Sequence, residues 1–174
     1  MKNAKKTIAV FFGGCSTEYE VSLQSASAVI GGVDEERYRL IPVGIDHRTG
    51  EWFRYCGDRE RIAEDEWQSG ADCVPAFPSM DKGIHGLCYL KKGQIKTISL
   101  DAAIPVLHGK NGEDGTLQGT LELMGVPVIG CGLLASAVCM DKVLAHRIVA
   151  ADGIKTAESF TLRKGGRPGL PGRY

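Results

Sequence analysis

Residues 7–22 decide the fold of this chain and read Thr7-Ile8-Ala9-Val10-Phe11-Phe12-Gly13-Gly14-Cys15-Ser16-Thr17-Glu18-Tyr19-Glu20-Val21-Ser22. The near-continuous apolar run over 7–12 predicts a parallel strand that is covered on both faces. The two glycines predict a turn, and Thr17 with Glu20 matches the capping box that begins a helix. Glu18 is therefore expected in the first helical turn, at the carboxyl end of the strand.

A second strand-and-loop unit of the same kind lies over residues 102–115. Residues 102–107 form another apolar run, and the loop that follows carries His108 and Glu113 among several glycines. In an open α/β sheet, ligands collect at the carboxyl ends of the strands. We therefore expect this loop and the 13–18 loop to lie side by side and to form one crevice.

Strand and helix patterns alternate along most of the chain, which predicts an α/β fold with a doubly wound, mostly parallel sheet and right-handed crossovers. A small antiparallel hairpin insertion is expected over 87–99. Residues 56–86 have weak periodicity and look like an insertion, with a short helix over 59–67. The other expected elements are strands over 39–45 and 126–129 and helices over 17–33, 116–124 and 133–151.

The last of these helices is expected to be long and continuous. Its apolar residues Ala137, Leu144 and Ile148 fall at helical spacing, which predicts a buried face. Asp152 and Gly153 then supply a stop signal.

The composition disfavours several classes of protein. The 174 residues are enough for one ordinary domain, or one domain with a piece of another. Lys plus Arg and Asp plus Glu number 21 each, so no basic surface is expected to recruit nucleic acid. No stretch resembles a signal peptide or a membrane span, and the six cysteines show no metal-binding spacing. We expect a cytoplasmic protein with reduced thiols, no membrane partner and no bound metal.

Glu18 has two interpretations. Its carboxylate could simply answer the positive end of the helix dipole, or it could accept charge-assisted hydrogen bonds from a cationic amine. The Gly13-Gly14 turn before it fits neither the G-x-G-x-x-G nor the G-x-x-x-x-G-K-[ST] phosphate loop. A nicotinamide dehydrogenase or a P-loop enzyme is therefore disfavoured.

The other candidate residues also have structural alternatives. A lone histidine is usually a core residue, but in a polar glycine loop His108 is better explained as a site residue that Glu113 orients or charges. Asp114 is expected to cap the helix that begins at Thr116. Lys142 lies on a helix where most lysines are solvated, so the residues alone assign it no function.

Three motifs together resemble the D-alanine–D-alanine ligase family. The N-terminal domain of that family carries F-G-G-x-S-x-E-x-x-V-S and L-H-G-x-x-G-E-D-G-x-x-Q-G, which match residues 12–22 and 107–119. A third match runs from Cys131 to Lys142 in the order and spacing of the family. Tyr19, where the common ligases often have His, makes the chain most similar to the D-alanine–D-serine ligases of vancomycin resistance.

The resemblance implies a Rossmann-like pre-ATP-grasp domain from an enzyme that uses ATP and Mg²⁺. In that family the carboxylate of a first D-alanine is phosphorylated, and the amine of a second D-amino acid attacks the acyl phosphate. Glu18 would be catalytic and hold the ammonium of the first D-alanine. Ser22, His108 and Glu113 would bind substrate, and Lys142 would reach an ATP phosphate. A homodimer is left open.

The resemblance covers about residues 5–162 and divides the chain into three parts. Residues 1–138 would be the N-terminal substrate-binding domain, 139–162 the connecting helix and the approach to the central ATP-grasp domain, and 163–174 a disordered or non-native tail. The family's Gly-Ser-Ser loop and acidic Mg²⁺ ligands do not occur in this sequence. Residues 1–174 alone are therefore expected to bind neither ATP nor Mg²⁺ and to have no ligase activity.

Two alternatives to this interpretation stay open. The chain could be a non-catalytic α/β binding or dimerisation module that has kept the fold without the reaction. It could also be the corresponding domain of another ATP-grasp ligase, which the long match over 107–119 disfavours.

Overall fold

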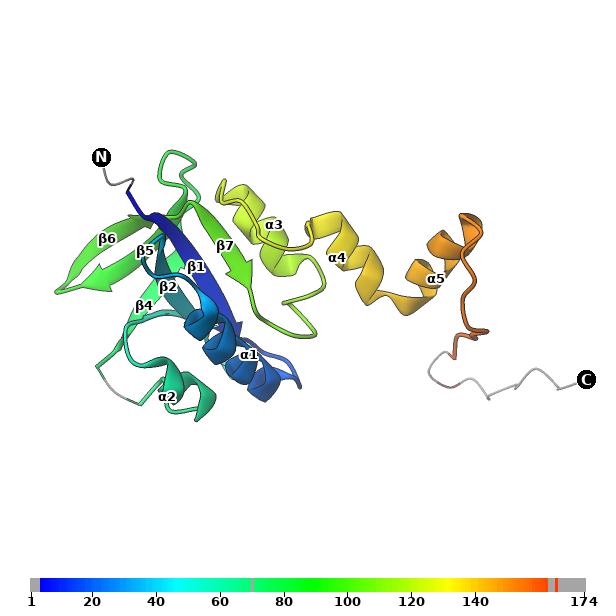
Figure 1. Cartoon of the computed structure of the whole chain (residues 1–174), viewed down its shortest axis with the longest axis horizontal. Helices are drawn as coiled ribbons and strands as arrows, with labels where there is room; N and C mark the ends of the chain where they lie inside the picture. Colours follow the sequence, from blue (N-terminus) through cyan, green and yellow to red (C-terminus); the bar gives the residue numbers. More distant parts are fainter. Residues whose placement is uncertain (1–3, 70, 163–164, 166–174) are drawn as a thin grey trace, which may run out of the picture.

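The computed structural model describes residues 4–69, 71–162 and 165, and these form a seven-stranded sheet with helices against it (Figure 1). The order across the sheet is β6-β5-β4-β3-β2-β1-β7. The strands are β1 (Lys6–Gly13), β2 (Tyr38–Ile45), β3 (Trp52–Tyr55), β4 (Cys73–Pro78), β5 (Gly86–Lys91), β6 (Gln94–Ser99) and β7 (Ala102–Pro105). The helices are α1 (Tyr19–Gly32), α2 (Arg59–Ala63), α3 (Thr116–Leu123), α4 (Leu133–Met140) and α5 (Lys142–Ala151). The predicted α/β class is confirmed.

Strand β1 lies inside the sheet and is covered on both faces. It pairs in parallel with β2 on one side and with β7 on the other. Because side chains of a strand alternate between faces, Ala9 and Phe11 pack with α3, whereas Val10 and Phe12 pack with α1. The doubly wound arrangement is therefore confirmed. The core residues of the two helices are Leu117 and Leu121 of α3 and Leu23 and Ala26 of α1.

The prediction of a mostly parallel sheet with one small antiparallel hairpin is wrong. Among the described residues two of the six strand pairings are parallel, and the four from β2 to β6 are antiparallel. Strands β2 and β3, and β5 and β6, are joined by short turns, which can connect only antiparallel neighbours. Strand β4 links the two hairpins into one sheet. Its Pro75 and Pro78 concealed it, because proline is rare inside a sheet.

The prediction of one long helix over 133–151 is also wrong. The chain turns at Asp141, whose backbone is extended and whose carboxylate accepts hydrogen bonds from the Val143 and Leu144 N–H groups at the start of α5. The expected buried face is exposed, because α5 leads away from the sheet and contains no buried residue (Figure 1). The exposed residues of that face are Ala137, Leu144 and Ile148.

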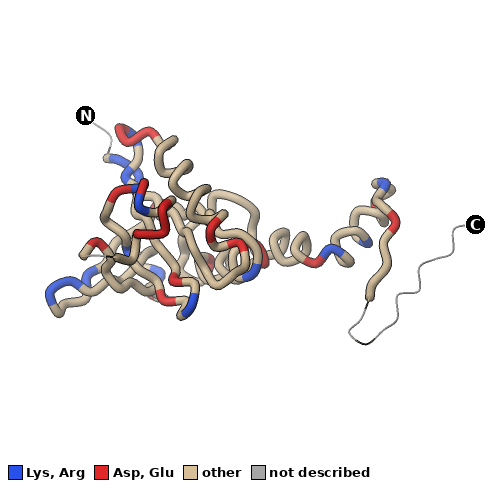
Figure 2. The backbone as a smooth tube through the Cα atoms, turned by 90° about the horizontal axis from the view of Figure 1, so that it is seen from below, with Lys and Arg blue, Asp and Glu red and all other residues tan. Residues whose placement is uncertain are grey.

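Charged side chains are spread over the described surface. Figure 2 shows acidic and basic residues interspersed along the sheet domain. None of the helices in the described part of the chain has the length and apolar character needed to cross a membrane. The prediction for the 163–174 tail falls outside the described residues, apart from Gly165.

The segment 56–72, expected to be part of an insertion, is anchored to the core by Trp67. The Trp67 side chain is only 1% exposed, and its ring packs edge-on against Phe12 with centroids 5.1 Å apart. The ring also lies directly over Gly44 of β2, where a methyl group would overlap three of its carbons. The segment is therefore packed into the domain through a contact that requires glycine on the strand.

Replacing Gly44 tests this contact. We expect Gly44→Ala to lower the free energy of unfolding by about 1–3 kcal/mol, because the buried indole has no room to move aside. Gly32→Ala is the matched control, since no atom lies within 4 Å of a methyl group at that position. Urea denaturation of both variants measures the effect. An unchanged midpoint for Gly44→Ala would show that Trp67 does not rest on this strand.

Candidate functional site

The loop after β1 and the loop after β7 meet at the carboxyl ends of these strands. The Ser16 hydroxyl donates a hydrogen bond of 2.7 Å to the carbonyl oxygen of His108. Glu18 lies so close to Gly109 that a methyl group there would be 2.5 Å from Oε2 of Glu18. The predicted adjacency of the two loops is confirmed, and it depends on the absence of a side chain at position 109.

Ser22 of α1 fastens these loops together from beneath. Its hydroxyl accepts a hydrogen bond of 2.9 Å from the Gly13 N–H and donates one of 2.6 Å to the carbonyl oxygen of Val106. The side chain is 0% exposed. The prediction that Ser22 contacts substrate therefore requires correction, because its only polar atom is buried and occupied by the ends of β1 and β7. Ser22 holds the site in place.

Glu18 stands at the start of α1 with its carboxylate exposed. Its N–H donates to the Ser16 hydroxyl over 3.0 Å, and within the described chain its carboxylate has no hydrogen-bond or ion-pair partner. The capping box predicted from Thr17 and Glu20 is absent from the described hydrogen bonds, because helical geometry begins only at Tyr19 and Thr17 precedes the cap position. A free carboxylate at this point can accept hydrogen bonds from a cation, and it also fits the dipole interpretation.

His108 and Glu113 lie next to each other, as predicted. Nδ1 of His108 is 3.9 Å from Oε1 of Glu113, and Nε2 of His108 is 3.1 Å from the Ser25 hydroxyl on α1. The other carboxylate oxygen of Glu113 accepts the Gly109 N–H at 2.7 Å. Glu113 therefore binds the loop backbone and also lies beside the imidazole. The His108 ring is held between Ser25 of α1 and Glu113 of the 108–115 loop.

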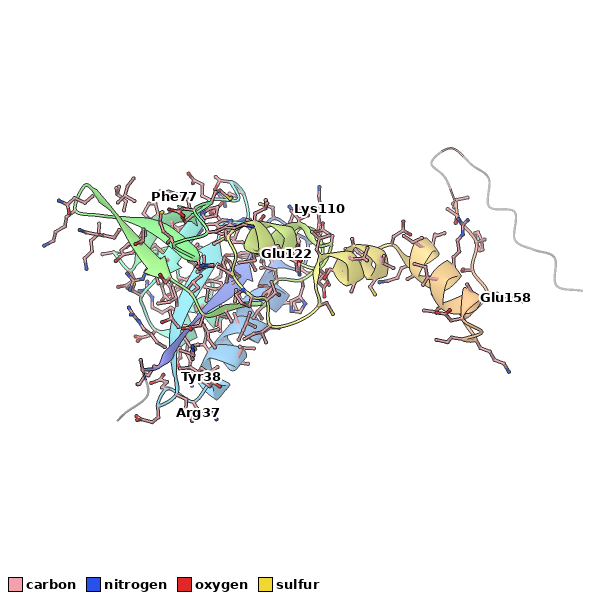
Figure 3. All side chains as sticks on the ribbon, turned by 90° about the horizontal axis from the view of Figure 1, so that it is seen from above. Arg37, Tyr38, Phe77, Lys110, Glu122 and Glu158 are labelled. Atoms are coloured by element: carbon pink, nitrogen blue, oxygen red, sulfur yellow. The ribbon has the colours of Figure 1, made fainter. Side chains whose placement is uncertain are left out.

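A cavity of about 350 Å³ opens beside His108. It lies between the end of β7, the 128–131 segment and α4, and it is large enough for a small ligand. Figure 3 places Lys110, on the loop, at the junction of the sheet domain and α4. The polar residues that line the cavity are Ser25, His108, Glu113, Gln118 and Ser136.

Two residues on the far side of the loop support it. Asp114 accepts hydrogen bonds from the Asn111 and Thr116 N–H groups, so its carboxylate supports the start of α3. It is not the N-cap that the sequence predicts, because Gly115 occupies that position and makes no side-chain cap hydrogen bond. Burial raises the pKa of Asp114, but these hydrogen bonds outweigh it and the net shift is downward. Gln118 was not predicted as a site residue. Its side-chain N–H donates to the carbonyl oxygen of Gly112, and its presence in the L-H-G-x-x-G-E-D-G-x-x-Q-G motif was the available signal.

Lys142 is not brought to the two loops. It begins α5, which lies beyond α4 and away from the sheet (Figure 1), and its ammonium donates to the carbonyl oxygen of Cys139 at 3.0 Å. Within residues 4–69, 71–162 and 165, no three His, Cys, Asp or Glu side chains gather as metal ligands.

The comparisons with known proteins agree with this arrangement. The family model described as "D-ala D-ala ligase N-terminus" matches residues 7–131. The chain belongs to this family. It is 43% identical over 160 residues to a D-alanine–D-alanine ligase of Caldicellulosiruptor bescii, covering 92% of this chain and 43% of the relative. It is 40% identical over 164 residues to the vancomycin B-type resistance protein VanB of Enterococcus faecalis, covering 94% and 46%.

A solved structure extends the match to three dimensions. The VanG D-Ala:D-Ser ligase from Enterococcus faecalis superposes with a TM-score of 0.82 and 46% identity, covering 89% of this chain and 44% of that chain. The resemblance to the D-alanine–D-serine ligases is thus supported by structure as well as by motifs. The chain spans less than half the length of these relatives and corresponds to the N-terminal part of the family.

Removing the Ser22 hydroxyl tests its role as a fastener. Ser22→Ala leaves the Gly13 N–H and the Val106 carbonyl buried without partners, at a cost of about 1–3 kcal/mol for each group. We expect a matching loss in the free energy of unfolding, measured with urea. Thr17→Ala is the control and should change it by less than about 0.5 kcal/mol. A comparable loss in both variants would instead indicate that the Thr17 hydroxyl caps α1, as the sequence predicts.

Asp46, in the turn after β2 at the same edge of the sheet, makes the stability of the fold depend on pH. Its carboxylate accepts hydrogen bonds from the Thr49 and Arg48 N–H groups and from Gln68, which lower its pKa to about 2. Because the folded pKa lies below the unfolded value of about 3.9, the stabilisation is present above pH 4 and is lost as the pH falls toward 2. Asp46→Asn should therefore be less stable than wild type at pH 7, with the gap closing near pH 2. A pH-independent gap in urea denaturation would contradict this.

Proposed function

We propose that this chain is the N-terminal substrate-binding domain of an ATP-dependent ligase that joins D-alanine to a second D-amino acid. The product would be the terminal dipeptide of peptidoglycan precursors. Residues 1–138 would form the substrate-binding domain, and 139–162 would lead toward the ATP-grasp part of the enzyme. The observation that carries the proposal is the free Glu18 carboxylate at the point where the two glycine loops cross.

Glu18 would accept hydrogen bonds from the ammonium of the first D-alanine. Its carboxylate has no partner within the described chain, so no internal ion pair has to break before the ligand binds. A charge-assisted hydrogen bond is about twice as strong as a neutral one. The absence of a side chain at Gly109 is consistent with this role, because a methyl group there would lie 2.5 Å from Oε2 of Glu18.

His108 and Glu113 would line the same substrate site. His108 is tied to α1 through Ser25 and lies beside Glu113, so its ring has a fixed place at the mouth of the cavity. An imidazole in this place can donate a hydrogen bond to the substrate carboxylate. Holding both ends of a small amino acid fixes the direction of its carboxylate.

ATP with Mg²⁺ would supply the phosphoryl group that activates this carboxylate, after which the amine of the second D-amino acid displaces phosphate and forms the amide bond. Lys142 would approach an ATP phosphate from the start of α5. The residues described here serve the first substrate. The second substrate, for which we infer D-serine or D-alanine, would be selected by other parts of the enzyme.

Substituting Glu18 tests the proposal in a full-length ligase that carries this domain. We expect Glu18→Gln to lower kcat/KM for the first D-alanine by about 10- to 150-fold, because a charged hydrogen-bond partner is worth about 1.5–3 kcal/mol. Dipeptide formation and phosphate release measure the effect. Glu20→Gln is the matched control, since it removes the same charge from the first turn of α1. Equal losses in the two variants would mean that Glu18 serves only the helix dipole.

A further inference from the structure

Tyr19, the neighbour of Glu18, is held on every side. Its hydroxyl accepts a hydrogen bond of 2.9 Å from the indole N–H of Trp67 and donates one of 2.6 Å to Oδ1 of Asp65. Its ring packs against the ring of His47 with centroids 4.8 Å apart, and a methyl group at Gly13 would lie 3.2 Å from its Cε2. The first turn of α1 is thereby attached to a segment 46 residues away along the chain.

The Tyr19 hydroxyl acts as the donor toward Asp65 throughout the physiological pH range. The Tyr19 side chain is only 8% exposed. Burial and the hydrogen bond to Asp65 raise its pKa well above the usual value. Trp67 is 1% exposed, so its N–H depends on Tyr19 for a partner. The three side chains form one hydrogen-bonded chain that ends on the Asp65 carboxylate.

Asp65 has a backbone conformation that would suit glycine better. Helix α2 ends in a Schellman motif, in which the Glu66 N–H reaches the Arg61 carbonyl at 2.8 Å and the Asp65 N–H reaches the Ile62 carbonyl at 3.1 Å. Asp65 occupies the left-handed position of this motif, with φ of 56°. Glycine is the usual residue there because a side chain strains this conformation. Unlike glycine, aspartate supplies a carboxylate that accepts the hydrogen bond from the Tyr19 hydroxyl.

We propose that Asp65, acting through the Tyr19 hydroxyl, is a positioning residue for the first-substrate site. It fixes the first turn of α1 and with it the direction of the adjacent Glu18 carboxylate. The 56–72 segment would then have a function beyond packing, since it places an acceptor where α1 needs one. This inference rests on the proposed role of Glu18 as the ammonium acceptor.

Two substitutions at position 65 separate positioning from stability. Asp65→Gly suits the left-handed backbone and keeps the end of α2 intact, but it removes the acceptor for Tyr19. Asp65→Asn also tolerates the left-handed conformation and keeps an acceptor oxygen. In the full-length ligase, Asp65→Gly should raise KM for the first D-alanine about three- to tenfold with little change in kcat. Asp65→Asn should leave KM close to that of wild type.

The double variant Asp65→Gly, Glu18→Gln distinguishes a positioning role from a purely structural one, because only a positioning role requires the effect on KM to depend on Glu18. If Asp65 acts through Glu18, Asp65→Gly should have no further effect on KM when Glu18 is already Gln. Thermal unfolding of each variant, with kinetics measured well below the midpoint, removes any contribution from unfolded enzyme.

The outcomes separate the two proposals. Additive effects in the double variant, or the same KM for Asp65→Gly and Asp65→Asn, would overturn the positioning role while leaving the function of Glu18 intact. Wild-type kinetics for Glu18→Gln would instead overturn the proposed function itself. A raised KM for Asp65→Gly that disappears in the Glu18→Gln background supports both.

Discussion

The candidate site depends on one buried hydroxyl, that of Ser22. It receives the Gly13 N–H and donates to the Val106 carbonyl, so it joins the ends of two parallel neighbours, β1 and β7. The Ser22 N–H in turn bonds to the Glu18 carbonyl at 3.1 Å, which makes Glu18 and Ser22 successive positions on one side of α1. Because Ser22 is held in place by the two strand ends, the position of Glu18 one helical turn earlier is fixed as well.

Close backbone approach is the second constraint, and it explains the glycines. Gly13 and Gly109 both have left-handed φ values, 86° and 72°, and both lie where a methyl group would collide with a neighbour. At Gly13 that neighbour is the Ile45 carbonyl, and at Gly109 it is the Glu18 carboxylate. A side chain at Gly109 would push the two loops apart, whereas a side chain at Gly13 would push the end of β1 away from the end of β2.

Local pattern was enough to predict β1, β7, α1, α3 and the meeting of the two loops, because burial on both faces and glycine turns leave strong signals. It did not reveal β4, whose prolines disguise an interior strand, or the turn at Asp141, where a side-chain cap replaces helix. Nor did it reveal the Tyr19–Asp65 bond. Hydrogen bonds between residues far apart in the chain have no sequence period, so they become visible only in the folded structure.

The role inferred for Tyr19 also bears on what this domain can select. Tyr19 first suggested the D-alanine–D-serine ligases, yet its hydroxyl is bound to Asp65 and Trp67 and its ring is buried, so it has no free surface for a second substrate. The choice of second substrate is then better sought outside the Glu18–His108 crevice.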